Sequence, residues 1–502
     1  MKFYITTPIY YVNDAPHLGH AYTTIAADVL AKYHRLKNDD VFFLAGADEH
    51  GLKIEQKAQE IKKDPKKFCD EITAKFQFLW NTLNISNDNF IRTTNVNHIK
   101  TVQKVIQILF DKKLIYKGEY KGFYCVGCEE YKTKIQLINK KCPLHKKEPE
   151  LIKEECYFFK LSKFQKKIIQ KIQKNEFKIE PIERKNEILG FLNKEKLEDL
   201  AISRKKVKWG ILLPFDKTHT TYVWIDAFLS YLTGIDWQGD VKKIPKFWPP
   251  NVQLMAKDIL RVHATIWPAL LLALNIPLPN KLFVHGFFTI NGQKMSKTIG
   301  NIIAPNDLIK NFGIDATRYL LLSQFPFEQD GDISVKKLEE KYNSDLVNGL
   351  GNLVARVLTL AGKFSEPSIP HSKAVEYSGK CGIKIQKTWE EYEKNINNIH
   401  FFETLKIIWN LINFFDKYIE KEKPWEIKND SKQLNKILSP LLEGICHLGI
   451  MLLPFMPEIS EKIFIQLGIE KEITKKSFEK LKKIGQFKFK VQRSENLFPR
   501  KR

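Results

Sequence analysis

The spacing of apolar and polar residues predicts alternating strands and helices in the first part of the chain. Residues 2–7 form a run of β-branched and aromatic side chains, which favours a strand. Proline, asparagine and aspartate then mark a loop, and from His17 apolar residues recur at helical spacing. The short apolar run 41–45 predicts a second strand, and charged helical stretches follow to about residue 84 and from 97 to 113. This order indicates a doubly wound parallel sheet.

The pattern changes twice further along the chain. Residues 116–131 are rich in tyrosine, glycine and cysteine, which is typical of an insertion into the sheet. Strand-like runs return at 221–226, 252–256 and 281–285, and from about residue 336 only helical spacing remains. The predicted fold class is therefore α/β: a doubly wound, Rossmann-like parallel sheet, interrupted by an insertion and followed by an all-α domain.

These changes divide the chain into five predicted segments. They are the first half of the sheet domain (1–115), the connective insertion (116–203), the second half of the sheet domain (204–290), a loop and linking region (291–345), and the helical domain (346–502).

Composition narrows the class of protein. The 502 residues include 81 Lys and Arg against 58 Asp and Glu, a net charge of +23, which favours a polyanionic partner such as nucleic acid. Biased genome composition is an alternative cause of this charge. The longest apolar run, 266–276, is too short to cross a bilayer, and no leader pattern precedes the first strand, so we expect a cytoplasmic protein. Seven irregularly spaced cysteines suit thiols or metal ligands better than a disulfide framework.

The sequence His17-Leu18-Gly19-His20 lies where the first strand gives way to a helix. Open α/β sheets bind phosphates at such junctions, because backbone N–H groups and the helix dipole point outward there and a small residue lets a ligand approach. By itself the pattern also fits two ordinary helix-capping histidines.

Two pairs of metal-ligand residues lie in the insertion: Cys125 with Cys128, and Cys142 with His145. Each pair has the spacing that lets two ligands bind one metal ion, and four such ligands complete a tetrahedron with no open position. The pattern predicts one structural zinc, which would stabilise a segment too polar to have much core of its own. The alternative is four unrelated residues.

A lysine-rich loop follows the last predicted strand. Lys294 and Lys297 flank a serine in the sequence KMSKT, shortly after a glycine. Two cations and a hydroxyl on a glycine-flanked loop suit a mobile clamp for a polyphosphate, and the alternative is a solvated basic loop.

Together, HLGH and KMSKT are the two signature motifs of class I aminoacyl-tRNA synthetases, and over essentially its whole length the chain resembles the methionyl-tRNA synthetase family. The resemblance includes TTPIYYVND-PHLGH, AGADEHG, the single-zinc insertion typical of bacterial members, YVWIDA, AKDI followed by a histidine, HGF, KMSKT and KPW. It implies methionine–tRNA ligase activity: methionine and ATP-Mg²⁺ form methionyl-adenylate and pyrophosphate, and the methionyl group then passes to the 3′-terminal adenosine of tRNA. Orientation and charge stabilisation would carry this chemistry, since neither step needs a protein nucleophile.

The resemblance also assigns roles in ATP and methionine binding. His17 and His20 would bind the triphosphate, Gly19 would leave room for adenine, and Lys294 and Lys297 would stabilise the leaving pyrophosphate. The methionine pocket would consist of Pro8, Ile9, Tyr11, Asp48, Trp224, Ala227, Tyr231, Ile259 and His263. Asp48 would pair with the substrate's ammonium group, and the aromatic side chains would surround the thioether. For these aromatics, core packing is the alternative.

In the helical domain the resemblance assigns anticodon recognition to Asn352, Arg356, Pro424 and Trp425. An exposed ring beside Arg and Asn donors is a common way to read an unstacked RNA base. The implied partner is tRNA(Met), initiator and elongator, with the anticodon CAU. Asn348 shares the expected helix face and is either a further reader or structural.

Two departures from the family and three rival functions bear on this interpretation. The closing threonine of KMSKT replaces the commoner serine and keeps the hydroxyl. Many relatives append a C-terminal tRNA-binding and dimerising domain, and this sequence stops at Arg502 without one, so we expect a monomer. Leucine, isoleucine and valine enzymes carry a larger editing insertion, and a cysteine enzyme would have thiolate zinc ligands in its catalytic pocket. A small nucleotidyltransferase would lack the helical domain, and a non-enzymatic RNA-binding module would not need both phosphate motifs.

Overall fold

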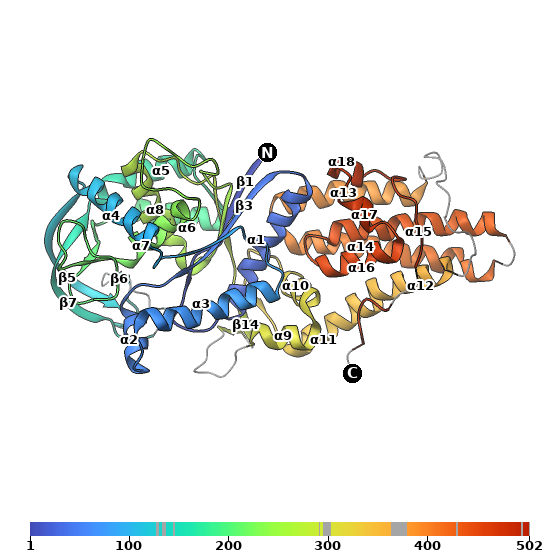
Figure 1. Ribbon diagram of the computed structural model, residues 1–502, viewed down its shortest axis with the longest axis horizontal. Helices are drawn as coiled ribbons and strands as arrows, with labels where there is room; N and C mark the ends of the chain where they lie inside the picture. The colour runs from blue at the N-terminus through green and yellow to red at the C-terminus, as the bar shows by residue number, and fades with distance from the viewer. Residues whose placement is uncertain are drawn as a thin grey trace.

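The computed structural model has an α/β part and a helical part side by side along its longest axis (Figure 1). It describes residues 1–126, 130–132, 137–143, 146–290, 292–294, 303–362, 379–427, 430–492 and 495–500. Among these residues, no helix is both long and apolar enough to cross a bilayer.

A seven-stranded parallel sheet forms the centre of the α/β part. Its strand order is β2-β3-β1-β12-β13-β8, and β4 also pairs with β3. The strands are β1 (Lys2–Thr6), β2 (Tyr10–Tyr11), β3 (Asp40–Asp48), β4 (Asn89–Arg92), β8 (Lys178–Glu180), β12 (Val252–Ala256) and β13 (Lys281–His285). Alternate residues of β1 point to opposite faces of the sheet: Phe3 and Ile5 pack into the apolar core on one face, and Tyr4 packs into the core on the other. Both faces are therefore buried, as expected of a doubly wound sheet.

Helices cover the two faces of this sheet. They are α1 (Leu18–Leu36), α2 (Leu52–Glu60), α3 (Pro65–Thr82), α4 (Val96–Asp111), α5 (Gln165–Gln173), α6 (Ile182–Lys194), α7 (Val223–Thr233) and α8 (Leu260–Leu274). The first charged stretch, predicted as one helix to about residue 84, is two helices, because Asp64 and Pro65 start a new one: the Asp64 side chain accepts a hydrogen bond from the Lys67 N–H.

The strand predicted at 221–226 is wrong. Only β11 (Thr220–Thr221) is extended, in antiparallel pairing with β10 (Ser203–Arg204), and α7 begins at Val223. The run 221–226 is short and largely apolar, with no regular polar alternation, so periodicity alone does not separate a buried strand from a buried helix.

The insertion forms a second, antiparallel sheet with the order β6-β5-β7-β9. Its strands are β5 (Ile115–Cys125), β6 (Glu130–Lys132), β7 (Glu150–Phe159) and β9 (Leu200–Ala201). The stretch 116–203 is not wholly separate from the main sheet, however. It also contains β8, which pairs in parallel with β13 at the edge of that sheet.

The remaining elements connect the sheet to the helical part. They are β14 (Phe288–Ile290), β15 (Gln293–Lys294), α9 (Pro305–Phe312), α10 (Ile314–Leu322), β16 (Gly331–Asp332), α11 (Val335–Lys341), a π-helical segment (Tyr342–Gly351) and α12 (Asn352–Ala361). The last three follow one another without a break, so the predicted boundary at 345/346 lies within continuous helix.

The helical part packs against α1 and shares one apolar core with that face of the sheet. Its helices are α13 (Lys380–Asn397), α14 (Phe401–Glu422), α15 (Ser431–Leu452), α16 (Pro457–Leu467), α17 (Glu470–Ile473) and α18 (Phe478–Leu481). Arg318 of α10 is fully buried at the junction, where it pairs with Asp28 of α1 at 2.7 Å and donates to the carbonyls of Pro454 and Phe455. The two parts are thus fixed to each other close to α1.

Candidate active site

The first predicted site is the N-terminus of α1. His17 caps this helix: its Nδ1 accepts a hydrogen bond from the Gly19 N–H at 3.1 Å, and His20 Nδ1 accepts one from the His17 N–H at 3.2 Å. The two imidazoles stack, with 3.6 Å between ring centroids. A Cβ at residue 19 would lie 3.0 Å from His17 Cε1, so glycine is what lets the His17 ring take this position.

These caps determine where the histidine protons are. A ring nitrogen that accepts a hydrogen bond carries no proton, so in both residues the proton is on Nε2. Burial, together with the neighbouring His17, lowers the pKa of His20 well below its usual range, and His20 is therefore neutral near pH 7. Two imidazole N–H donors and the positive end of a 19-residue helix dipole suit this junction to an anionic ligand.

The carboxyl end of β13 lies against the same helix. Thr23 Oγ1 of α1 is 2.7 Å from His285 Nε2, and His285 Nδ1 donates to the Gly286 carbonyl at 2.7 Å. Burial lowers the pKa of His285 to about 4, so Nε2 stays an acceptor at neutral pH. This contact joins the HLGH helix to the strand that leads toward the KMSKT sequence.

The KMSKT sequence begins in the hairpin β14–β15, which turns at Gly292 with a φ of +70°. Asp332 Oδ1 accepts hydrogen bonds from the Gly292 N–H at 2.8 Å and from the Thr289 hydroxyl at 3.0 Å. The hairpin is therefore held from the neighbouring β16. Lys294 ends β15, while its side chain and the whole of Lys297 lie outside the described residues.

The predicted amino-acid pocket is supplied in part by α7 and α8. Trp224, Ala227 and Tyr231 lie at i, i+3 and i+7 on α7, so they share one face. Tyr231 Oη lies 2.9 Å from His263 Nε2. His263 Nδ1 in turn donates to the carbonyl of Ile259 at 2.9 Å, which leaves Nε2 as the acceptor for the Tyr231 hydroxyl proton.

The ionisation states of this pair suit an apolar substrate. Burial lowers the pKa of His263 to about 4 and raises the pKa of Tyr231 well above its usual range. Both side chains are thus neutral near pH 7, and the one hydroxyl proton of the pair is already donated within it. A polar substrate side chain that needs a donor finds none in this pair.

The end of β3 forms the other wall of the predicted pocket. Tyr11 of β2 is the register partner of Asp48, and Pro8 and Ile9 lie in the segment just before β2. The Tyr4 hydroxyl of β1 donates to the Tyr231 carbonyl at 2.7 Å, which connects the centre of the sheet to α7. Residues that are more than 200 positions apart in the sequence are therefore brought together here.

Three buried polar residues near this pocket were not among the predicted site residues. Asp226 of α7 accepts from His50 Nδ1 and from His98 Nε2, each at 2.7 Å, and His98 Nδ1 lies 2.7 Å from Thr233 Oγ1. Their spacing in the sequence gives no sign of the contact. The only available signal was that Asp226 and His50 lie within motifs already quoted, YVWIDA and AGADEHG.

Two of the four predicted zinc ligands can be placed. Cys125 ends β5 and is buried, and Cys142 is fully buried. The Cys142 carbonyl accepts from the Lys146 N–H at 2.7 Å and its N–H donates to the Lys147 carbonyl at 2.9 Å, so backbone hydrogen bonds connect Cys142 to both lysines. Cys128 and His145 lie outside the described residues, among which no group of three potential metal ligands occurs.

Of the predicted anticodon residues, Arg356, Pro424 and Trp425 lie together in the helical part. Arg356 of α12 lies over Trp425, with 5.7 Å between its guanidinium carbon and the ring centroid, and pairs with Glu420 of α14 at 2.6 Å. Pro424 is buried and begins the 3₁₀ turn that presents Trp425, which is 45% exposed. Asn352 is the first residue of α12; because the segment before it is π-helical, Asn348 does not have the α-helical spacing that the sequence predicted.

Comparison with known proteins places this arrangement in a family. The sequence model of the class I tRNA synthetases (M) matches residues 3–136 and 132–358, and that of the anticodon-binding domain of tRNA ligases matches residues 383–498. The methionine–tRNA ligase of Caldanaerobacter subterraneus is 42% identical over 99% of the chain and 78% of its own length, and that of Bacillus subtilis is 39% identical over the same shares. The chain belongs to the methionine–tRNA ligase family.

Solved structures of this family have the same fold. Mycobacterium tuberculosis methionyl-tRNA synthetase in complex with methionyl-adenylate aligns over all of both chains, with a TM-score of 0.93 and 32% identity. The apo form of that enzyme aligns with a TM-score of 0.86 and 29% identity. The mixed α/β catalytic domain and the helical anticodon-binding domain predicted from the sequence are thus confirmed.

Proposed function

We propose that this protein activates L-methionine with ATP and transfers the product to tRNA(Met). A methionine carboxylate oxygen attacks the α-phosphorus, an acyl–phosphate bond forms, and the bond to the β-phosphate oxygen breaks to release pyrophosphate. The 2′- or 3′-hydroxyl of the terminal adenosine then attacks the acyl carbon and AMP leaves. Two observations support this proposal. The chain belongs to the methionine–tRNA ligase family, and Tyr11, which pairs with Asp48 of β3, lies in the segment that continues directly to His17 at the start of α1.

On the ATP side, the residues that act are His17, Gly19, His20, Lys294 and Lys297. The imidazoles donate hydrogen bonds from Nε2 to phosphate oxygens, and the α1 dipole adds a fixed positive potential that needs no reorganisation during the reaction. The lysines stabilise the negative charge that grows on the leaving pyrophosphate. Mg²⁺ enters bound to ATP, as part of the substrate.

On the methionine side, the Asp48 carboxylate binds the ammonium group, and Trp224, Tyr231 and His263 surround the side chain. The Tyr231 hydroxyl already donates its proton to His263, and this supports selection of a thioether, because a substrate group that needs a hydrogen-bond donor would lose its bonds with water and find no donor in this pair. Pro8, Ile9, Tyr11, Ala227 and Ile259 complete the pocket.

In the insertion, Cys125, Cys128, Cys142 and His145 would hold one structural Zn²⁺. The burial of Cys125 and Cys142 and the backbone hydrogen bonds of Cys142 support such a site, and a filled tetrahedral shell would contribute to folding without taking part in the reaction. Elemental analysis of the purified protein should find about one zinc per chain; none would remove the zinc site from the proposal.

In the helical part, Asn352, Arg356, Pro424 and Trp425 would read the anticodon CAU of initiator and elongator tRNA(Met). The half-exposed indole beside the Arg356 guanidinium supports stacking on an unpaired base. A monomeric state and a cytoplasmic location remain predictions.

ATP–pyrophosphate exchange, measured with each of the twenty amino acids in turn, tests the proposed first step. We expect exchange with methionine and little with the others. Exchange that depended on leucine or cysteine instead would overturn the methionine assignment, and exchange with none would overturn the adenylation step.

A further inference from the structure

The two walls of the methionine site are held together by one buried carboxylate. Asp226 lies on α7, the helix that carries Trp224, Ala227 and Tyr231, but on the opposite face, about half a turn away from Trp224. Thr233, seven residues after Asp226, shares this opposite face. Asp226 is 1% exposed. Because it lies on the face of α7 opposite Trp224, Ala227 and Tyr231, Asp226 does not line the pocket itself, and any effect on the substrate must pass through the helix.

Two histidines from different elements donate to this carboxylate. His50 lies two residues after Asp48, in the turn between β3 and α2, and donates from Nδ1; His98 lies in the first turn of α4 and donates from Nε2, each at 2.7 Å. Both rings are buried. The end of β3, α4 and α7 thus meet at a single carboxylate.

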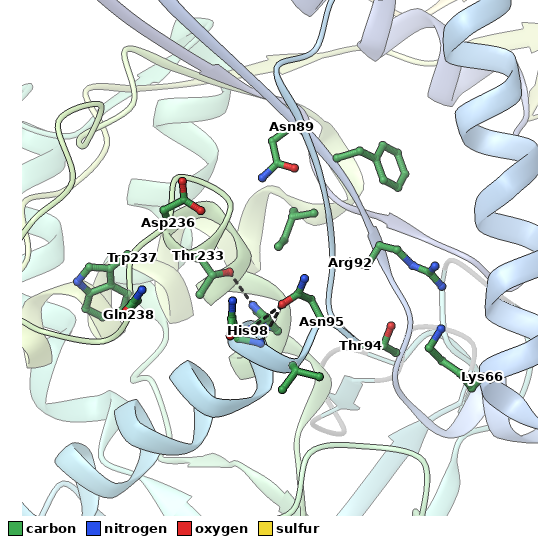
Figure 2. A pocket seen from close by; sticks show the side chains of 14 residues that line it. Lys66, Asn89, Arg92, Thr94, Asn95, His98, Thr233, Asp236, Trp237 and Gln238 are labelled. Atoms are coloured by element: carbon green, nitrogen blue, oxygen red, sulfur yellow. Dashed lines mark hydrogen bonds between the residues drawn. The ribbon is translucent and has the colours of Figure 1, made fainter.

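His98 makes a hydrogen bond from each of its two ring nitrogens. Nε2 donates to Asp226, so in the neutral ring Nδ1 is an acceptor, and it lies 2.7 Å from the Thr233 hydroxyl. His98 therefore contacts α7 at two positions, seven residues apart. Thr233 and His98 also line a polar cavity of about 450 Å³ beside β4 (Figure 2). The network thus extends from the turn after Asp48 to this cavity.

The charge of the cluster is consistent with a permanent carboxylate. Burial would raise the pKa of Asp226, but the two histidines outweigh it and hold this pKa below its usual range. An ionised acceptor makes stronger hydrogen bonds than a neutral one, so the distance between the three elements is closely constrained.

We propose that Asp226, His50 and His98 are positioning residues that set the spacing between Asp48 and the α7 face of the methionine site. This inference rests on the proposed methionine activation. A shift of α7 relative to β3 would separate the group that binds the substrate's ammonium from the side chains that surround its thioether. The loss should therefore appear in methionine binding and not in ATP binding.

The two histidines allow a reciprocal test, because they donate from different nitrogens. A glutamine amide takes roughly the place of Nε2 and an asparagine amide that of Nδ1. We expect His98→Gln and His50→Asn to keep the methionine KM in ATP–pyrophosphate exchange within about threefold of the unchanged protein, and His98→Asn and His50→Gln to raise it about tenfold with the ATP KM unchanged.

His447→Gln is the matched control. His447 is a buried histidine of α15 that accepts from Trp389 Nε1 at 3.0 Å, in the helical part, and its loss should lower the melting temperature without altering the methionine KM. Thr233→Val is a milder variant for the case in which a histidine variant does not fold; it should raise the methionine KM about threefold.

A methionine KM that was the same in all folded variants, or that rose equally for both substitutions at each histidine, would overturn the positioning role. Failure of the proposed function is separately visible, because the unchanged protein would then show no methionine-dependent exchange.

Discussion

The two parts of the molecule carry their predicted functional residues in opposite ways. In the α/β part, the carboxylate and the histidine of the predicted methionine pocket are buried: Asp48 is 8% exposed and His263 2%. In the helical part the predicted stacking ring is at the surface: Trp425 is 45% exposed, and Arg356 beside it pairs with a neighbouring glutamate. Both parts also bury ionisable side chains away from these residues, among them Glu443 and His447 in the helical part and Asp28 and His98 in the α/β part.

This difference follows from the size of the ligands. A free amino acid is recognised only if it is removed from water and surrounded, so its binding groups must be part of the core. An anticodon loop is larger than any pocket here and can be read only on an exposed face. Substitutions in the α/β part should therefore change adenylation, stability or both, while surface substitutions in the helical part should change only the tRNA step.

The largest effect should come from Lys297→Ala. Removal of a cation from the leaving pyrophosphate should slow ATP–pyrophosphate exchange by about 10²- to 10³-fold, while methionine affinity stays the same. Lys310→Ala, at an exposed lysine of α9, is the control and should leave exchange unchanged. Unchanged turnover in Lys297→Ala would contradict the clamp role.

A smaller effect, confined to the tRNA step, is expected of Trp425→Ala. Loss of the stacking face should lower the efficiency of tRNA aminoacylation about tenfold, since stacking on one base contributes roughly 1–3 kcal/mol. Exchange should not change. Trp425→Phe keeps an aromatic face and should retain most of the aminoacylation. An equal loss in aminoacylation and in exchange would contradict the assignment of Trp425 to the tRNA step alone.

Periodicity predicted the strands of the sheet well where a buried run was bounded by loops. The runs 252–256 and 281–285 coincide with β12 and β13. It failed at 221–226, where an apolar run is the start of α7. Pattern alone also missed that β8 joins the main sheet, because three residues carry too little signal and the pairing depends on a partner about 100 positions away.

Local sequence indicated the histidines of HLGH, the lysines of KMSKT and the zinc-ligand pairs, whereas the methionine-pocket and anticodon residues came from the resemblance to the family. The structure adds contacts that neither source contains. The spacing of His17 and His20 suggested a helix start, and both do cap α1. The Tyr231–His263 pair joins two helices, and Asp226 joins three elements. No spacing rule links residues 50, 98 and 226, because their contact depends on how α4, α7 and β3 pack.

The smallest expected effect is a difference in the response of the two parts to acid. His263 and His285 have folded pKa values of about 4, below the ordinary 6.5, because both are buried. As the pH falls from about 6.5 toward 4 the unfolded chain binds these protons first, so each histidine should lower the unfolding free energy by up to about 1.4 kcal/mol per pH unit. Asp416 of α14 has the opposite sign: burial raises its pKa to about 6, so the folded helical part gains stability as the pH falls below 6.

Hydrogen exchange at pH 7 and pH 5, followed in α7 and α8 and in α14, checks this contrast. We expect protection to fall in α7 and α8 and to hold or rise in α14. His263→Gln and His285→Gln should each make the α/β response shallower, and Asp416→Asn should remove the pH-dependent gain in α14. Equal loss of protection in both parts would mean that the core they share makes them unfold as one unit. The α/β part and the helical part would then differ in the exposure of their sites but not in their response to acid.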